Sequence, residues 1–352
     1  MLSFRKLTPA PGLTLVETNA PPAPGLGEVV ISVRAAGICG SDLHVHEWHG
    51  GYDFMKSHLP VTLGHEFSGI VHAVGPDVTT SKPGDRVVVW PSSPCGACHE
   101  CIKGTIQNCE NKRTLGLYAD GAFASHVLVR SNGVFQIPEG VDFDVAALTE
   151  PLCVGRRAVI VGEARPGSHA LVLGPGTIGQ AIAIFAREAG ASVAIAGFND
   201  AARLKVCNEL GFTDTFDLSD DGERARMTDR HSDCDIVFEA TGRSESITDA
   251  LSLLRKEGIL VVTGIHSQPV TIELTTLVRR KLQIRTSHGA QPDDWWQTLE
   301  TIKQLGCRLN PMISHRLPLK DIQKGFDLAL SRAASKVIIQ PESDLLEGRK
   351  EP

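Results

Sequence analysis

The sequence has no long apolar run, no long basic run and no apolar leader segment. Its most apolar window, residues 171–185, is interrupted by Gly174, Pro175 and Gly176, which indicates a strand, a turn and a helix instead of a membrane span. The first residues, MLSFRKLTPAPG, lack the apolar core of a secretory signal. The formal net charge of −6 argues against nucleic acid or an anionic membrane as the main partner. We therefore expect a cytoplasmic protein without a nucleic-acid or membrane partner.

The composition is that of a folded chain with an unusual cysteine distribution. Hydrophobic residues make up 42% of the 352 residues and charged residues 22%, which allows a sizeable core in two domains or one elaborated domain. Of the nine cysteines, four fall within CGACHECIKGTIQNC, residues 95–109. Because cytoplasmic thiols stay reduced, clustered cysteines indicate a metal site or catalysis before disulfides.

The spacing within this cluster predicts a structural zinc site. Four thiolates satisfy a tetrahedral zinc ion and leave no coordination position open, so the ion would stabilise a loop and do no chemistry. The alternative is a pair of disulfides or four unrelated thiols. The predicted ligands are Cys95, Cys98, Cys101 and Cys109. Four further cysteines are expected to be small buried hydrophobes, namely Cys153, Cys207, Cys234 and Cys307.

A second metal site, with one open position, is predicted elsewhere in the chain. Cys39 lies in one glycine-flanked turn, and His65 and Glu66 lie in another. A thiolate, an imidazole and a carboxylate make a zinc site that keeps a position for water or substrate. Glu150, in AALTEPLCVG, adds a further carboxylate. Each of these motifs alone is more often structural, and the motif that follows favours the functional interpretation.

A glycine-rich turn indicates a dinucleotide site. Its glycines are Gly174, Gly176 and Gly179, and Thr177 and Ile178 open the helix that follows. A strand is expected at 169–173 and a second at 192–196, so the pattern is strand, turn, helix and strand. Such glycines let a pyrophosphate approach the amino terminus of the helix. The alternative is a plain βαβ unit with a glycine turn.

The remaining patterns predict an α/β chain with two domains. Strands at 235–240, 258–264 and 282–286, with a helix at 246–254, continue a doubly wound parallel sheet from about 154 to 288. Short strands before it predict a small β-barrel-like domain. After it, helices at 295–305 and 319–331 and a strand at 336–339 are expected to pack back on that first domain. The expected domains are residues 1–153 with 289–352, and residues 154–288; residues 343–352 are read as a polar tail.

In their order along the chain, five segments resemble the medium-chain zinc-dependent alcohol dehydrogenases. They are GICGSD, GHEFSG, the four-cysteine lobe, the EPL glutamate and GPGTIG. The resemblance covers nearly the whole chain and is strongest to the branch of polyol (sorbitol, butanediol) and L-threonine dehydrogenases. It implies a GroES-like catalytic domain, a Rossmann domain, a catalytic and a structural zinc ion, NAD+ or NADP+, and a homodimer or homotetramer.

The resemblance also assigns roles to residues. Cys39 and His65 match catalytic zinc ligands, and Glu66 and Glu150 match acidic positions that bind this metal directly or through water. Ser41 matches the hydroxyl that takes the substrate proton, and the four-cysteine cluster matches the structural zinc lobe.

His44 matches the relay histidine at the cofactor ribose. His46 and His49 lie beside it, and a solvated or core histidine is the alternative for each of the three.

The chain departs from the NAD pattern where an acidic residue usually binds the ribose hydroxyls. That position holds Gly197, followed by Phe198. Loss of the carboxylate leaves room for a 2′-phosphate, and Arg203 could pair with it, which favours NADP. The alternative is that Asn199 or Asp200 serves the ribose of NAD. The two interpretations stay open.

A polyol is the expected substrate, with L-threonine as the alternative. Threonine-oxidising members usually carry a histidine shortly before the structural cysteines, where this chain has Ser92, and they tend to lack the glutamate found here at Glu150. Pocket-lining or merely packed aromatic residues would be Trp48, His49, Tyr52, Phe54 and Trp90. A non-catalytic protein that binds zinc and a dinucleotide is the rival from another class. Residues 258–264 are the expected sheet-edge strand for pairing between subunits.

Overall fold

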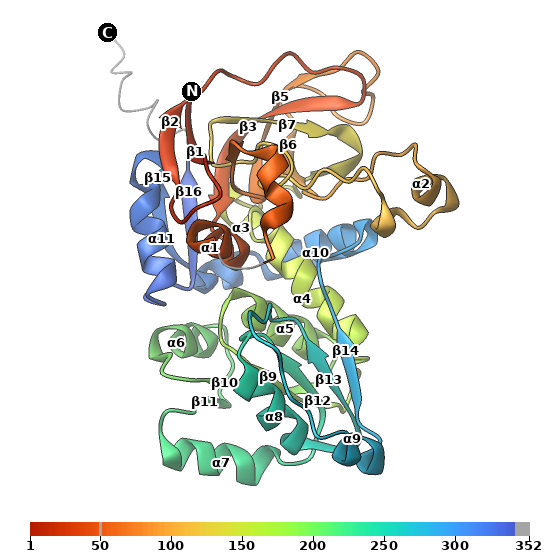
Figure 1. The fold of residues 1–352 in the computed structure, drawn as a ribbon, viewed down its shortest axis with the longest axis vertical. Helices are drawn as coiled ribbons and strands as arrows, with labels where there is room; N and C mark the ends of the chain where they lie inside the picture. Colours follow the sequence, from red (N-terminus) through yellow and green to blue (C-terminus); the bar gives the residue numbers. More distant parts are fainter. Residues whose placement is uncertain (49–50, 342–352) are drawn as a thin grey trace. The chain divides into compact units, whose positions relative to one another are not determined.

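The computed structural model describes residues 1–48 and 51–341, and it separates into two units (Figure 1). The first unit takes residues 1–150 together with the chain from Gln291 onward, and the second takes Pro151–Ala290. His49 and the expected tail at 343–352 lie outside the described residues. Within the described part, no helix is long and apolar enough to cross a membrane.

The second unit is built on a six-stranded parallel sheet, ordered β11-β10-β9-β12-β13-β14. This order is that of a doubly wound dinucleotide-binding sheet, so the predicted α/β fold class is confirmed. The strands are β9 (His169–Leu173), β10 (Ser192–Gly197), β11 (Thr215–Asp217), β12 (Cys234–Glu239), β13 (Leu254–Val262) and β14 (Gln283–Thr286). The helices are α5 (Thr177–Glu188), α6 (Ala201–Glu209), α7 (Asp221–His231), α8 (Ser244–Leu253) and α9 (Leu274–Arg280).

The inner strands of this sheet have the continuous apolar character of strands covered on both faces. In β9, the sequence HALVL buries its last four residues. Helix α5 buries residues along most of its length, in keeping with its run of Ile, Ala and Phe. The predicted strands and the predicted helix of this motif are confirmed within a few residues at their ends.

The prediction for the edge of the sheet was wrong. Residues 258–264 fall mostly within β13, which lies between β12 and β14. The free edge on that side is β14, whose residues are exposed or half-buried. Apolar periodicity identifies a strand, but the order of strands in a sheet depends on crossovers that local sequence does not encode.

The first unit contains two sheets. A seven-stranded sheet runs in the order β15-β16-β3-β5-β6-β8 with β7 also paired to β3, and a three-stranded sheet runs in the order β2-β1-β4. The strands are β1 (Leu2–Lys6), β2 (Thr14–Glu17), β3 (Glu28–Gly37), β4 (Val61–Thr62), β5 (Glu66–Val74), β6 (Arg86–Val89), β7 (His126–Arg130), β8 (Val134–Gln136), β15 (Ile313–Pro318) and β16 (Lys336–Gln340).

The carboxyl-terminal part of the chain forms part of this unit. Strand β16 pairs with β3 in an antiparallel register that sets Ile338 opposite Gly37. Helix α10 (Pro292–Leu305) contains the first expected helix. The second expected helix is divided into a 3-10 turn, η5 (Leu319–Asp321), and α11 (Ile322–Leu330).

Two local predictions differ from the structure. Glu66 does not lie in a turn, because it begins β5. Of the four cysteines expected to be buried, Cys153, Cys207 and Cys234 are buried, but Cys307 is exposed. Cys307 lies in the 3-10 helix η4 (Gly306–Met312), where the apolar contacts are made by Leu309 and Met312.

Candidate functional site

Strand β3 delivers Cys39 to the amino terminus of helix α1 (Gly40–Glu47), where Cys39 is the capping residue. The buried carboxylate of Asp42 accepts a hydrogen bond of 2.9 Å from the Cys39 backbone N–H. This contact fixes the start of the helix and therefore the direction of the thiol. Ser41 lies in the same first turn.

Pairing of β3 with β5 brings the other candidate ligands to this point. In the antiparallel ladder Glu66 lies opposite Gly37, and Gly37 precedes Cys39 by two residues. A Cβ atom at Gly37 would collide with Oε2 of Glu66, so this position needs glycine. The sulfur of Cys39, a ring nitrogen of His65 and an oxygen of Glu66 all lie within 4.8 Å of one another. The structure thus assembles three of the four residues predicted for the open metal site.

The charges around these atoms favour a bound cation. Burial raises the pKa of the Cys39 thiol, and the Glu66 carboxylate raises it further. Burial opposes a positive charge on His65, but Asp42 and Cys39 outweigh it and raise the pKa of the imidazole well above its usual value. Nδ1 of His65 lies 3.6 Å from Oδ1 of Asp42. The site therefore concentrates negative groups around one cationic position.

Glu150 lies near the start of helix α4 (Thr149–Val161) and outside the group of three ligands. Burial raises the pKa of its carboxyl to about 7, and the charges of His65, Glu66 and Lys336 also act on it. Because charges interact strongly in a buried environment, protonation of Glu150 is coupled to the charges of the three-residue group.

Lys336 is a residue of this site that sequence reasoning missed. Its Nζ atom donates to Oε2 of Glu66 at 2.5 Å and to the carbonyl of Ile38 at 2.9 Å, and only 3% of its side chain is exposed. The attraction of Glu66 and of Cys39 outweighs burial and raises the pKa of the Lys336 ammonium. A lysine that opens the apolar strand KVIIQ was a possible signal, because a buried lysine requires a partner.

The donor set fits zinc. Sulfur, imidazole nitrogen and carboxylate oxygen are the usual zinc ligands, and Oε1 of Glu66 is buried with no hydrogen-bond partner. An orphaned buried carboxylate oxygen is costly unless a proton or a cation satisfies it. The group could therefore hold a zinc ion.

Ser41 and Tyr52 contribute hydroxyl groups beside this position. Oγ of Ser41 lies 3.3 Å from Nε2 of His65. Burial, followed by the negative charges of Cys39 and Asp42, raises the pKa of Tyr52 to about 12, so its phenol stays neutral and can donate a hydrogen bond.

His44 and the other predicted aromatics are placed differently. The ring of His44 stacks against Tyr52 with 6.4 Å between centroids. Trp90 is buried, and Trp48 packs against the core beneath the Lys6 ammonium. Phe54 is exposed and stacks on Tyr118 at 4.9 Å. Tyr52 responds to the charges of the metal-ligand group through the shift of its pKa.

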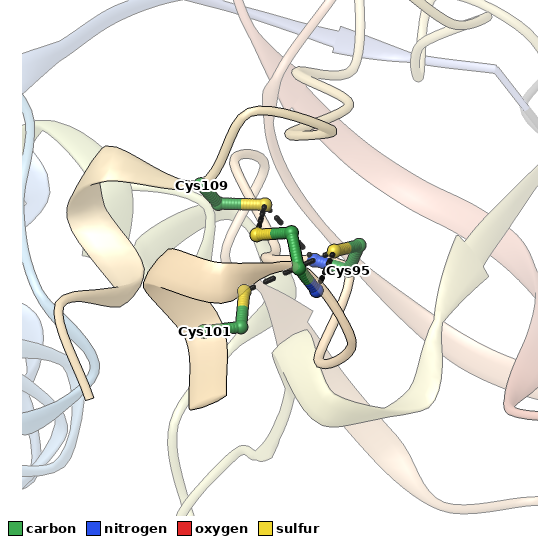
Figure 2. A group of neighbouring side chains, drawn as sticks. Cys95, Cys101 and Cys109 are labelled. Atoms are coloured by element: carbon green, nitrogen blue, oxygen red, sulfur yellow. Dashed lines mark hydrogen bonds between the residues drawn. The ribbon is translucent and has the colours of Figure 1, made fainter. Parts of the chain in front are cut away.

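The four cysteines of the second cluster converge on one point (Figure 2). The sulfur atoms of Cys95 and Cys101 are 3.9 Å apart, and those of Cys98 and Cys109 are 3.8 Å apart. Disulfides need about 2.05 Å between sulfurs, and all four cysteines are free, so the disulfide alternative does not hold. Backbone N–H groups of residues 97 and 98 donate to Cys95 and lower the pKa of its thiol to about 6, which favours a thiolate.

The glycine turn has the geometry expected of a phosphate cradle. Gly174 takes φ +109°, and Gly176 caps the amino terminus of α5, which begins at Thr177 and Ile178. A Cβ at Gly179 would collide with the carbonyl oxygen of Gly174. The turn can therefore exist only with glycine at this position, and it leaves the helix terminus open to an anion.

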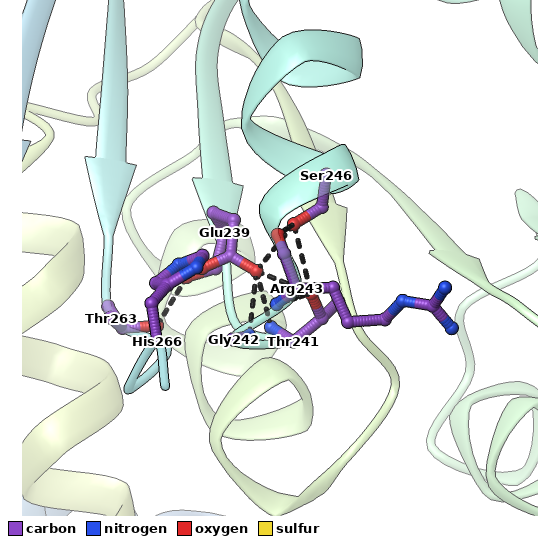
Figure 3. Close-up of polar contacts among 7 residues, drawn as sticks. All are labelled: Glu239, Thr241, Gly242, Arg243, Ser246, Thr263 and His266. Atoms are coloured by element: carbon purple, nitrogen blue, oxygen red, sulfur yellow. Dashed lines mark hydrogen bonds and ion pairs between the residues drawn. The ribbon is translucent and has the colours of Figure 1, made fainter. Parts of the chain in front are cut away.

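A buried carboxylate organises the neighbouring loops at the carboxyl end of the sheet (Figure 3). Glu239 is fully buried, and its Oε1 accepts hydrogen bonds from the backbone of Thr241 and Gly242 and from the hydroxyl of Ser246. Nε2 of His266 lies 3.1 Å from Oε2. Since Thr241 would also touch a Cβ at Gly174, this cluster supports the glycine turn from the side.

The predicted ribose-binding residues lie at the end of β10. The Arg203 guanidinium is held by Asp200, with Nε donating to Oδ1 at 2.7 Å and Nη2 paired with Oδ2. Asn199 has a left-handed backbone, and its N–H donates to Asp217. Sequence spacing had not anticipated the pairing of Arg203 with Asp200.

We expect Lys336→Met to lower the free energy of unfolding by about 3–5 kcal/mol in the metal-free protein, because Glu66 becomes an unpaired buried charge. Urea unfolding of the variant and of the wild type measures the difference. Lys336→Met combined with Glu66→Gln should recover part of the loss. Lys281→Met, which breaks an exposed ion pair with Glu257, is the control and should change little. A single variant as stable as the wild type would contradict the buried pair.

Comparison with known proteins gives matches over nearly the whole chain. Residues 25–139 match the family model of the alcohol dehydrogenase GroES-like domain, and residues 177–304 match that of the zinc-binding dehydrogenases. The chain is 32% identical to sorbitol dehydrogenase of Halalkalibacterium halodurans, covering 93% of this chain and 95% of that protein.

Two further matches extend the comparison. The chain is 33% identical to L-threonine 3-dehydrogenase of Bacillus velezensis, covering 94% and 96% of the two chains. The crystal structure of 2R,3R-butanediol dehydrogenase from Bacillus subtilis is similar at 27% identity, with a TM-score of 0.84 over 97% of this chain and 99% of that chain.

Proposed function

This chain belongs to the zinc-dependent medium-chain alcohol dehydrogenases, and we propose that it oxidises a secondary hydroxyl group of a polyol or sugar alcohol to a ketone. NAD+ or NADP+ is the hydride acceptor. The observation that carries the proposal is the group of Cys39, His65 and Glu66, which offers one sulfur, one nitrogen and one oxygen ligand within 4.8 Å and has the Ser41 hydroxyl beside it. A structural cluster would have no need of an adjacent hydroxyl and an orphaned carboxylate oxygen.

The chain's own residues divide the work of catalysis. Zinc held by Cys39 and His65, with Glu66 and Glu150 bound to it directly or through water, would act as a Lewis acid on the substrate oxygen and lower the pKa of the hydroxyl. Ser41 accepts the hydroxyl proton, and its Oγ lies 3.3 Å from Nε2 of His65.

The remaining roles lie with the relay histidine, the dinucleotide turn and the zinc lobe. In line with the family resemblance, His44 would relay the proton at the cofactor ribose. The turn at Gly174, Gly176 and Gly179 binds the pyrophosphate, with Thr177 and Ile178 presenting the helix terminus. The four-cysteine lobe holds the structural ion.

A polyol suits the charges of the site better than an amino acid does. The carboxylate of an amino acid requires a free cation, but Lys336, the buried lysine beside Glu66, is already paired with that carboxylate. A polyol needs neutral hydrogen-bond donors and acceptors, such as the phenol of Tyr52. Ser92 bonds to Thr114 at 3.1 Å and places no imidazole before the cysteine lobe. L-Threonine is the second candidate, because proteins named L-threonine 3-dehydrogenase match the chain at similar identity.

Dehydrogenase activity is tested with the zinc-loaded enzyme by following nicotinamide reduction at fixed substrate concentration. The panel holds hexitols, pentitols, butanediol and L-threonine, each with NAD+ and with NADP+. We expect rates with polyols that exceed those with L-threonine. Ser41→Ala should lower kcat by about 10²–10⁴ while keeping its zinc. Activity with L-threonine alone would favour the second candidate over a polyol. No activity with any substrate of the panel would favour a non-catalytic zinc- and dinucleotide-binding protein.

We expect Cys39→Ser to abolish turnover and to lower the zinc content from two ions per chain to one, because the two ligand groups are separate. Metal analysis after dialysis gives the stoichiometry. Cys101→Ser is the matched variant, since it should lose the other ion. Unchanged zinc in Cys39→Ser would refute the assignment of this residue as a ligand.

We infer a homodimer or homotetramer in which strand β14 forms the contact between subunits. No strand among the described residues pairs with its outer edge. Ile284 on it is 37% exposed, and Leu274 and Val278 on the preceding α9 are 69% and 75% exposed. Val278→Lys should shift the sedimentation coefficient towards the monomer. Leu26→Lys, at an exposed position of the other unit, is the control. A monomeric wild type would refute the assembly.

A further inference from the structure

We propose that His169 and His231 form a proton-sensitive latch, which holds the end of helix α7 against the parallel sheet and opens when both imidazoles are protonated. His169 begins β9, and His231 ends α7, 62 positions later in the chain. The other end of β9 leads into the glycine turn, so the latch lies at the opposite end of the strand. It does not depend on the dehydrogenase activity proposed above.

A direct contact joins the two rings. Nε2 of His169 lies 2.7 Å from Nδ1 of His231, with 4.9 Å between the ring centroids. At this distance one of the two nitrogens must carry a proton and the other must offer its lone pair. His231 is 5% exposed, so the contact is shielded from water.

The other nitrogen of His231 faces a carboxylate. Nε2 lies 2.8 Å from Oδ2 of Asp214, in a close electrostatic contact that does not meet hydrogen-bond geometry. A lone pair on Nε2 would be repelled by the carboxylate, and this nitrogen therefore carries a proton. Arg230 shares the same carboxylate, because its Nη1 lies 2.9 Å from Oδ1.

These contacts limit the two rings to one positive charge. While His231 is neutral, its Nδ1 accepts a hydrogen bond from Nε2–H of His169. When His231 is charged, the bond reverses, and Nδ1–H donates to a neutral His169. If both rings are charged, two N–H groups oppose each other across 2.7 Å and the positive charges repel. The second proton therefore requires that the rings separate.

The charged neighbours of the pair do not remove this restriction. Among the described residues they include Asp214 with Arg230, and Asp235 with Arg255. Oδ2 of Asp235 accepts a hydrogen bond of 2.7 Å from the backbone N–H of His169, and its Oδ1 lies 2.6 Å from Nε of Arg255. Each aspartate is thus shared with an arginine, which reduces the negative charge available to a doubly charged histidine pair.

The packing of His231 also opposes a second charge. Its ring lies edge-on to Phe216 at 5.4 Å, and its carbonyl accepts a hydrogen bond from the thiol of Cys234 at 3.3 Å. Burial lowers the pKa of the His231 imidazole, and the charge of His169 lowers it further, against the attraction of Asp214. The closed arrangement therefore excludes a proton that the open one can bind.

The sign of the pH dependence follows from this difference. In the open form both rings titrate near the ordinary histidine pKa of about 6.5. Below that pH the open form binds one more proton than the closed form, so acid favours opening. One extra proton raises the equilibrium constant for opening by roughly tenfold per pH unit. Well above pH 6.5 the two forms bind equal numbers of protons, and the dependence disappears.

Hydrogen exchange followed by mass spectrometry, on the full-length zinc-loaded protein, tests the latch. Peptides from α7 (Asp221–His231) should be protected at pH 8. After correction for the intrinsic pH dependence of amide exchange, their opening should increase by up to about tenfold per unit between pH 6.5 and pH 5.

His169→Gln is the primary variant. The amide of glutamine can turn to donate to the neutral His231 ring or to accept from the charged one, so the second proton no longer forces separation. The acid dependence of α7 exchange should disappear, with protection at pH 8 close to that of the wild type. His231→Gln is the reciprocal variant and should give the same loss. His126→Gln is the matched control, because His126 packs edge-on to another imidazole, His72, at 5.0 Å in the other unit.

Corrected α7 exchange that stays constant between pH 8 and pH 5 in the wild type would overturn the latch. An unchanged acid dependence in either glutamine variant that folds would assign the response to other groups, such as Asp214 or Asp235, and would overturn the role of the histidine pair. Loss of the dependence in His126→Gln would show that the effect is not local to α7 and would overturn the latch as well. None of these measurements uses turnover, so they stand apart from the test of the dehydrogenase.

Discussion

The candidate metal site depends on a buried ion pair between Lys336 and Glu66, residues 270 positions apart in the chain. Two charges taken out of water are tolerated only with close pairing and further hydrogen bonds, and Lys336 obtains both from Glu66 and the Ile38 carbonyl. The ladder that joins β16, β3 and β5 sets this geometry, and it also places Cys39 beside His65. The strand pairing that builds this unit therefore also positions the candidate metal ligands.

Local spacing predicted the parts of the structure whose chemistry is local. The four-cysteine lobe and the turn at Gly174 were found because their ligands or their backbone demands lie within a few residues of one another. Lys336 was missed because its partner lies in a distant strand, and the edge position of β14 was missed because strand order depends on crossovers. Cys307 was placed in the core on composition alone, although its 3-10 turn exposes it.

The end of β10 shows how a single short contact changes a functional interpretation. From the sequence, Asp200 was a plausible ribose ligand and Arg203 a plausible phosphate ligand. In the structure Arg203 and Asp200 pair with each other. Both carboxylate oxygens of Asp200 are therefore engaged, and one guanidinium nitrogen of Arg203 takes no part in the pair. The charges that the protein has already paired therefore decide which groups near the end of β10 remain to bind a ligand.

Strand β16 has a consequence for the biosynthesis of the protein. Chains emerge from the ribosome amino terminus first, so Cys39, His65 and Glu66 are synthesised long before Lys336. Until β16 pairs with β3, the Glu66 carboxylate lacks its buried partner Lys336. Burial of an unpaired carboxylate is unfavourable, so this region stays open to water at that stage. The region around Glu66 therefore reaches its final arrangement only after residues 336–340 have been synthesised. A chain that stops before residue 336 lacks both the partner of Glu66 and the strand that pairs with β3.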